Sequence, residues 1–110
     1  MTPRIFDLPV SLQRMPVLSG CEIMEGDVTD QHSLALAAEG VDGIIHLAGM
    51  MTIACQRDPR RAFELNVQGS LNVFEAARAA CASVAYLSSA GVFGPSDAVH
   101  PPAADAVWRD

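Results

Sequence analysis

The most regular hydrophobic pattern in the chain lies between Asp58 and Ala82, where apolar residues recur every three or four positions. This period places one apolar stripe along one side of a helix. At spacings of four, four and three residues, the stripe consists of Phe63, Val67, Leu71 and Phe74. Asp58 can cap the helix, and Pro59 suits its first position because a missing N–H costs nothing there. The pattern therefore predicts one long helix over Asp58–Ala82.

Short apolar runs with the length of β-strands stand on both sides of this helix. The run before it, Val41–Leu47, is apolar on both faces apart from Asp42 and His46, which is typical of a buried parallel strand. The run after it is Val84–Ser88. Strand, helix and strand in this order predict a βαβ unit with parallel strands.

The N-terminal part of the chain has weaker signals of the same kind. Arg4–Leu8 and Cys21–Glu25 predict two short strands. Two prolines interrupt the residues between them, so we expect Val10–Gly20 to be a loop or a short irregular helix.

A second helix is predicted over Gln31–Glu39. Thr29 or Asp30 can cap its start, and Gly40 can end it in the left-handed conformation. Strands and helices then alternate along the chain, which predicts the α/β class with a mostly parallel sheet. Ligands of such sheets bind at the carboxyl ends of the strands.

Composition limits the classes of function. The 110 residues allow one small domain, and half of them are hydrophobic, so a core is available. Net charge is −6, with seven arginines and no lysine, which gives little support to nucleic-acid binding. The apolar runs are too short to span a bilayer, and the N-terminus lacks the apolar region of a signal peptide. We expect no membrane partner and a cytoplasmic location.

The cysteines and histidines are scattered and do not predict a metal site. They are Cys21, Cys55, Cys81, His32, His46 and His100. The three cysteines fit neither a zinc spacing nor a disulfide framework, so we expect reduced thiols in or near the core. His46 lies in an apolar strand, where we expect a hydrogen-bonded structural residue rather than a ligand.

Acidic, small and hydroxyl residues occupy four predicted strand ends. In order, these are Asp7, Gly26-Asp27, Leu47-Ala48-Gly49 and Ser88-Ser89. The edge of a nucleotide cofactor requires residues of this kind. Small residues end strands in many proteins, however, and the pattern alone leaves both interpretations open.

Four motifs in this order resemble those of the extended short-chain dehydrogenases/reductases, the NAD-dependent epimerase/dehydratase family. They are Gly26-Asp27-Val28-Thr29-Asp30, His46-Leu47-Ala48-Gly49, the helix segment from Asn66 to Ala77, and the segment from Ser88 to Gly94. The resemblance covers about Arg4 to Gly94. It implies a partial Rossmann-like doubly wound parallel sheet with family strands 2 to 5, incomplete at both ends.

The resemblance implies an adenosine site at the first two strand ends. Asp7 would bind the adenosine ribose hydroxyls. Its carboxylate would repel the 2′-phosphate of NADP and so favours NAD, although NADP stays open because the preference rests on Asp7 alone. Asp27 and Val28 would hold the adenine ring.

The resemblance also implies roles at the other two strand ends. Close approach of the cofactor to the backbone would involve Leu47, Ala48 and Gly49. Ser88 would lie beside the nicotinamide, and Ser89 would be the catalytic hydroxyl that binds the reacting oxygen of the substrate. Asn66 would support the catalytic site from the helix, through its main chain and a water molecule.

Two parts that the family uses do not occur in these 110 residues. One is the GxxGxxG turn that brings the cofactor's pyrophosphate to a helix N-terminus. The other is the YxxxK pair, because the sequence has no lysine and its only tyrosine, Tyr86, lies in a predicted strand. We therefore expect residues 1–94 to form a partial NAD(P)-binding domain, and residues 95–110 to be an irregular tail at a truncation point.

This interpretation leaves the second and fourth family strands without the first strand between them. We expect the chain by itself either to be marginally stable or to pair those two strands across the gap. A cooperative thermal transition well above room temperature would contradict marginal stability.

Three functions follow. The first is a fragment of an NAD-dependent sugar-nucleotide epimerase/dehydratase or related dehydrogenase, which transfers hydride through the nicotinamide and is inactive by itself. The second is a non-catalytic truncated protein that acts as a binding or oligomerisation module. The third is a generic α/β binding module in which the motif order is chance. In the family the long helix often forms half of a dimer interface, so the resemblance also implies a homodimer through Asp58–Ala82.

Overall fold

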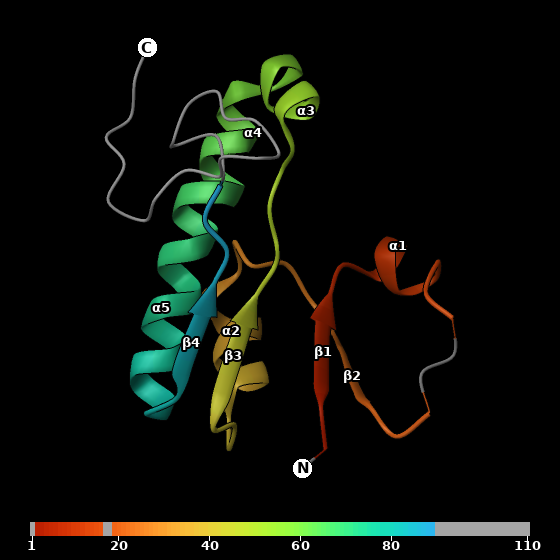
Figure 1. The fold of residues 1–110 in the computed structure, drawn as a ribbon, viewed down its shortest axis with the longest axis vertical. Helices are drawn as coiled ribbons and strands as arrows, with labels where there is room; N and C mark the ends of the chain where they lie inside the picture. Colours follow the sequence, from red (N-terminus) through yellow and green to blue (C-terminus); the bar gives the residue numbers. More distant parts are fainter. Residues whose placement is uncertain (1, 17–18, 90–110) are drawn as a thin grey trace, which may run out of the picture.

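The computed structural model describes residues 2–16 and 19–89, which form short parallel strands and helices in alternation (Figure 1). The elements in chain order are β1 (Arg4–Asp7), α1 (Pro9–Leu12), β2 (Glu22–Glu25), α2 (Gln31–Ala38), β3 (Gly43–His46), α3 (Thr52–Arg57), α4 (Pro59–Phe63), the π-helix η1 (Glu64–Gln68), α5 (Gly69–Ala80) and β4 (Ser83–Tyr86). The predicted tail, residues 95–110, lies outside the described residues.

The strands form two separate parallel pairs rather than one sheet. In one pair β1 lies beside β2 with Arg4 opposite Glu22, and in the other β3 lies beside β4 with His46 opposite Tyr86. Figure 1 shows the order β4, β3, β1, β2, with β1 and β3 facing each other. Within the described part of the chain no ladder joins β1 to β3, so the expected pairing across the gap does not occur. Marginal stability stays a prediction.

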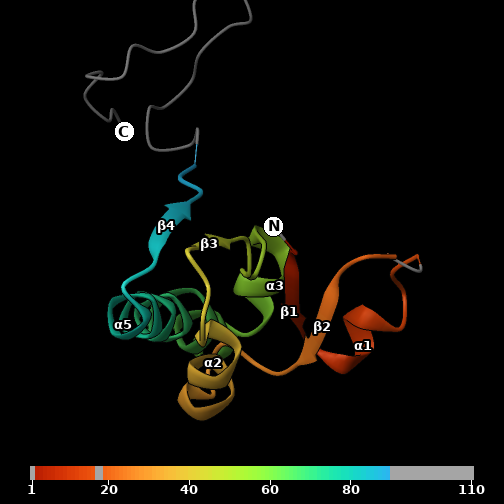
Figure 2. The ribbon, with the colours of Figure 1, turned by 90° about the horizontal axis from the view of Figure 1, so that it is seen from below.

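The helices α2 and α5 form a layer on one side of β3 and β4 (Figure 2). The buried centre of this layer is a cluster from α2 and α5: Leu34, Ala38, Val73 and Ala76. Phe6 of β1 and Ile44 of β3 both pack against this cluster. The two strand pairs therefore share one core although no backbone hydrogen bonds connect them.

Arg4 ties the first strand pair to α2. Its Nη1 donates to the carbonyl oxygens of Ala37 and Glu39, each at 2.8 Å, and its Nε donates to Glu22 at 2.8 Å. The two carbonyls are at the C-terminal end of α2, where backbone acceptors have no intrahelical partner. The arginine thus fixes the angle at which the strand pair meets the helix.

The local signals for α2 are confirmed. Asp30 is the cap, because its carboxylate accepts the His32 N–H at 3.0 Å, and Thr29 instead donates to Asp27. Gly40 follows the helix with φ of +67°, as the sequence predicts. The helix ends at Ala38, one residue before the predicted Glu39.

The predicted long helix is present, but it contains an irregular turn and is preceded by a helix that the sequence analysis missed. Asp58 caps α4 by accepting the Arg61 N–H at 3.0 Å, as predicted. A π-helical turn, η1, interrupts the α-helical hydrogen bonding, and Cys81, with φ of +55°, ends the helix just before the predicted Ala82. The preceding helix, α3, has no side-chain cap and no apolar period, which explains why the pattern did not reveal it.

Some of the remaining expectations are confirmed and others are wrong: the central strand expected to be buried leaves Ile45 72% exposed, because within the described residues no strand pairs with the other edge of β3. The short α1 begins at Pro9, one residue before the segment predicted as a loop or irregular helix, and each predicted strand is present but shorter. All three cysteines are free, as expected, but Cys81 is exposed rather than in or near the core, because it follows the end of α5 at the surface. In residues 2–16 and 19–89 no helix is long and apolar enough to cross a membrane, and a cytoplasmic location stays a prediction.

Candidate cofactor site at the strand ends

A cavity of about 580 Å³ opens beyond the carboxyl ends of β3 and β4. Its lining comes from the end of β3, the π-helical turn and the end of β4: His46, Leu47, Ala48, Gly49, Met50, Met51, Asn66, Ser70, Tyr86, Leu87, Ser88 and Ser89. Six predicted site residues thus meet at one cavity, although they are spread over more than forty positions of the chain. They are Leu47, Ala48, Gly49, Asn66, Ser88 and Ser89.

Asn66 holds the turn that follows β3. Its Oδ1 accepts the Met50 N–H at 2.6 Å, and its Nδ2 donates to the Met50 carbonyl at 3.1 Å. The same carbonyl accepts the Cys55 thiol at 3.0 Å. The Asn66 side chain is therefore engaged in shaping the cavity wall, and it lies in η1, a kind of turn that often marks functional sites.

His46 is the buried polar residue on the floor of the cavity. Its Nε2 lies 2.9 Å from the Ser70 hydroxyl, and that hydroxyl donates to the Asn66 carbonyl at 2.7 Å. Because a hydroxyl has one hydrogen, His46 Nε2 must be the donor to Ser70, so this nitrogen carries a hydrogen, which in the neutral ring is the Nε2–H tautomer. Burial lowers the pKa of His46 and so favours this neutral form.

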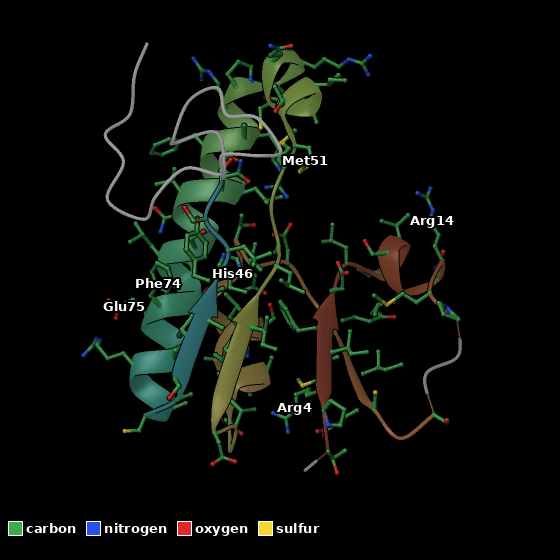
Figure 3. The ribbon with its side chains drawn as sticks, viewed as in Figure 1. Arg4, Arg14, His46, Met51, Phe74 and Glu75 are labelled. Carbon is green, nitrogen blue, oxygen red and sulfur yellow. The ribbon has the colours of Figure 1, made fainter. Side chains whose placement is uncertain are left out.

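Aromatic contacts fix the His46 ring. The ring stacks on Tyr86 of β4 with centroids 5.5 Å apart, and Phe74 of α5 meets it edge-on at 6.4 Å. Figure 3 labels Phe74 on α5 and His46 beside the strand ends. The expectation of a hydrogen-bonded structural histidine is confirmed. Ser70, Tyr86 and the His46 ring also line the cavity, and no local sequence signal indicated this.

Asp27, at the end of β2, has a full set of protein partners. Its Oδ1 accepts the backbone N–H and the hydroxyl of Thr29 at 2.9 and 2.8 Å, and its Oδ2 accepts Arg61 Nη2 at 2.7 Å. Burial by itself raises the pKa of Asp27, but the bonds from Thr29 and Arg61 outweigh it and hold the pKa below its usual value. Sequence reasoning missed Arg61, because the pair is 34 positions apart and follows no local spacing.

Asp7 and Val28, the other two adenosine residues, lie with Asp27 away from this cavity. Asp7 ends β1, and its Oδ1 accepts the Leu8 N–H at 2.7 Å. Val28 packs against the core and against Gly69, where an added Cβ would come within 2.7 Å of the Val28 side chain. The structure thus separates the predicted site into two groups, one at each strand pair.

Gly49 and Gly26 differ in what surrounds them. A Cβ on Gly26 would collide with the Phe6 ring, so the protein's own packing demands glycine there. A Cβ on Gly49 would meet only Asn66 Oδ1, at an ordinary 3.5 Å, so the protein leaves the space in front of Gly49 open. The residues at this strand end therefore fit a ligand that approaches the backbone closely.

Known structures share this fold. The UDP-glucose 4-epimerase of Thermus thermophilus in complex with NAD aligns with a TM-score of 0.79 and 21% identity, over 96% of this chain and 36% of that chain. The L-threonine dehydrogenase of Clostridium difficile aligns with a TM-score of 0.74 and 23% identity, over 99% of this chain and 43% of that one. The predicted partial Rossmann-like fold class is confirmed.

Sequence comparison gives the family. Human 3 beta-hydroxysteroid dehydrogenase type 7 is 38% identical over 79 residues, which are 71% of this chain and 21% of that protein. UDP-glucose 4-epimerase of Neisseria meningitidis serogroup B is 35% identical over 89 residues, 76% of this chain and 26% of that protein. The chain thus spans less than a third of these relatives. Residues 3–105 match the 3-beta hydroxysteroid dehydrogenase/isomerase family, and the chain belongs to this family, in agreement with the predicted resemblance to the NAD-dependent epimerase/dehydratase type.

Proposed function

We propose that this chain forms part of the NAD site of a dehydrogenase or epimerase in which hydride passes between the nicotinamide and an alcohol carbon of the substrate. The observation that carries the proposal is the cavity beyond β3 and β4, where an open glycine, a π-helical asparagine and two serines meet. Bound NAD supplies the hydride chemistry, and the protein supplies binding and orientation. The choice of NAD as the cofactor is supported by one aligned structure, because the Thermus epimerase is a complex with NAD.

The residues that line the cavity have different roles at the nicotinamide end of the cofactor. Gly49, with Leu47 and Ala48, allows the cofactor to lie against the backbone. Ser88 lies beside the nicotinamide, and Ser89 binds the reacting oxygen of the substrate. Asn66 is a positioning residue, because its side chain is already bonded to Met50 and acts by holding the turn.

The adenosine end of the cofactor binds at the other strand pair, β1 and β2. Asp7 binds the ribose hydroxyls, and Val28 contacts the adenine. Asp27 can accept the adenine amine only if it shares its carboxylate with Arg61 and Thr29, which already occupy it. A carboxylate at Asp7 makes NAD the preferred cofactor over NADP.

For the substrate, we favour a hydroxysteroid. The family that matches residues 3–105 and the human relative both carry this activity in their names. A nucleotide sugar is the second candidate, because a UDP-glucose 4-epimerase is 35% identical over 89 residues. Both substrates present a hydroxyl-bearing carbon from which hydride can leave.

Turnover requires residues beyond these 110. The sequence has no lysine to pair with a catalytic tyrosine, and Tyr86 lies in β4 with its ring against His46. We therefore propose that the chain acts as a fragment of the enzyme and is inactive by itself. A non-catalytic binding or oligomerisation module is the alternative.

A binding experiment tests the cofactor site without requiring turnover. Titration of the ¹⁵N-labelled chain with NAD at millimolar concentration should shift the amide signals of Gly49, Ser88 and Ser89. Gly49→Val fills the open space. The Kd for NAD obtained from these shifts should rise at least about tenfold, which is equivalent to about 1.4 kcal/mol of binding free energy. The control is Gly43→Ala on the same strand, whose Cβ would meet only Ser83 O at 3.7 Å. Unchanged shifts in Gly49→Val would contradict the site.

We also propose that the outer side of α4, η1 and α5 forms a homodimer interface. The apolar stripe Phe63, Val67, Leu71 and Phe74 is exposed, and exposed apolar patches commonly mark protein contacts. Sedimentation velocity at about 100 µM should show a dimer that Leu71→Glu converts to a monomer. A wild-type chain that remains monomeric would contradict the interface.

A further inference from the structure

Arg61 connects the two parts of the chain that carry the two ends of the proposed NAD site. It lies in α4, which runs directly into η1 and so into Asn66 beside the cavity. Its Nη2 donates to Asp27 Oδ2 at 2.7 Å, across 34 positions of the chain. The guanidinium therefore bridges the helix at the nicotinamide end and the loop at the adenosine end.

Local contacts hold the arginine in this place. Its backbone N–H donates to Asp58 at 3.0 Å where α4 begins, and its Nη1 lies 3.5 Å from Glu64 Oε2, one turn further along the helix. The side chains of Arg61 and Asp27 are 36% and 28% exposed, so water has only partial access to the ion pair. A charge-assisted hydrogen bond in such surroundings holds its groups more firmly than one at the open surface.

The Asp27 carboxylate retains room for one more donor. A carboxylate offers about four acceptor positions, shared between its two oxygens. Oδ1 accepts twice from Thr29, at 2.9 and 2.8 Å, and Oδ2 accepts once from Arg61. Among residues 2–16 and 19–89 these donors leave one position open, on Oδ2 beside the arginine, and the partial exposure of Asp27 allows a ligand to reach it.

The contact geometry decides whether Arg61 holds Asp27 for a ligand or competes with the ligand for it. A guanidinium that bound the carboxylate through two nitrogens would take both oxygens. Here the hydrogen bond to Asp27 comes from Nη2, while Nη1 faces Glu64. Arg61 therefore fixes one oxygen and leaves that oxygen a second acceptor position, which favours holding over competition.

We propose that Arg61 is a positioning residue of the adenosine end, which orients Asp27 so that the open Oδ2 position accepts the exocyclic amine of adenine. The assignment rests on the proposed function, because it takes Asp27 as a residue that binds adenine. A base with a carbonyl oxygen in the place of the amine would bring acceptor against acceptor, and an unpaired polar group weakens binding. Arg61 is then also a determinant of specificity for adenine over hypoxanthine.

Adenosine and inosine are the two probes, because inosine has a carbonyl where adenosine has the exocyclic amine. Each is titrated into the full ¹⁵N-labelled chain, and the Kd is obtained from the amide shifts of Val28 and Thr29. Arg61→Ala should raise the Kd for adenosine about fivefold and change the Kd for inosine less than about twofold. Arg61→Lys, which restores a charged donor, should recover part of the loss. The control is Arg60→Ala, at the exposed neighbouring arginine, and it should leave both values unchanged.

Two further measurements separate positioning from a general effect on the fold. Nicotinamide mononucleotide probes the other end of the site, and its Kd should not change in Arg61→Ala. In an Asp27→Asn background, Arg61→Ala should change the Kd for adenosine less than about twofold, because Arg61 acts through the carboxylate.

The outcomes that overturn the assignment are distinct. Tighter adenosine binding in Arg61→Ala would show competition, and unchanged binding would show that Arg61 has no role. Equal losses for adenosine, inosine and nicotinamide mononucleotide would show a purely structural residue. A wild-type chain that binds nicotinamide mononucleotide but not adenosine removes the assignment and leaves the nicotinamide end of the proposed function standing, whereas a chain that binds neither contradicts both.

Discussion

The two sides of the helix formed by α4, η1 and α5 differ in an unexpected way. The inner side, against the strands and α2, consists of small or polar residues and one valine: Ala62, Gly69, Ser70, Asn72, Val73, Ala76 and Ala77. The outer side carries the larger apolar residues of the predicted stripe, and Phe63 is 62% exposed. An amphipathic helix usually turns such a stripe toward its own core. Here the stripe is directed away from most of the core, and only Phe74 contacts aromatic residues at the strand ends.

The inner side can be small and polar because the helix approaches its neighbours closely and satisfies its polar groups. Asn72 is 3% exposed, and it accepts from Gln31 and Gln68 at 3.1 Å and donates to the Val28 carbonyl at 3.0 Å. Its amide links α5 to the loop that carries Asp27. Large apolar residues therefore do not by themselves indicate the buried side of a helix.

Removal of the Asn72 amide should have the largest effect on the free energy of unfolding, and a substitution on the outer side of the helix should have a much smaller one. Asn72→Ala should lower the free energy of unfolding by about 3 kcal/mol, because it breaks three hydrogen bonds at a buried position. Urea titration followed by circular dichroism measures the loss. The matched control is the outer neighbour Leu71→Ala, and an equal loss there would remove the distinction between the sides.

A substitution at Gly69, where the helix lies close to Val28, should have the second largest effect on the free energy of unfolding. Gly69→Ala places a methyl group within 2.7 Å of Val28, and we expect a loss of about 1 kcal/mol despite alanine's better helix propensity. In a Val28→Ala background, where the contacting side chain is gone, the same Gly69→Ala substitution should cost less than it does in the wild type. If the single variant is more stable than the wild type, the contact does not limit packing.

The buried His46 should give a smaller effect, confined to acidic pH. Its pKa is lowered by burial, so the unfolded chain binds a proton more readily than the folded chain. The stability contributed by neutral His46 is fully present above its ordinary value of 6.5 and is lost as the pH falls through the lower folded pKa. Denaturant titrations between pH 7.5 and 5 should show a decrease in wild type that is reduced in His46→Asn. Parallel decreases in the two proteins would contradict this assignment.

Polar substitutions on the outer side should have the smallest effect on the folded monomer. Phe63→Ser and Val67→Ser remove exposed apolar surface, so the free energy of unfolding should change by no more than about 0.5 kcal/mol. Urea titration at micromolar concentration, below dimer formation, measures this. A loss as large as that of Asn72→Ala would place these residues in the core of the monomer.

Much of the local structure was predictable from the sequence. The Asp30 and Asp58 caps, the left-handed Gly40 and the βαβ pattern around the long helix depend on residues close together in the chain. The role of the Asn66 side chain could not be predicted, because its hydrogen bonds go to Met50, sixteen positions away. For the same reason Asp27 was predictable as a site residue, but its partner Arg61, 34 positions away, was not.

The sequence by itself determined the α/β class, the strand ends and the family, because each depends on residue types in a fixed order along the chain. Tertiary structure decided which side of the long helix is buried, which of the candidate residues share a cavity, and which strand edges remain unpaired. Those properties depend on how segments pack in space, and the same hydrophobic period is compatible with either side of a helix facing inward.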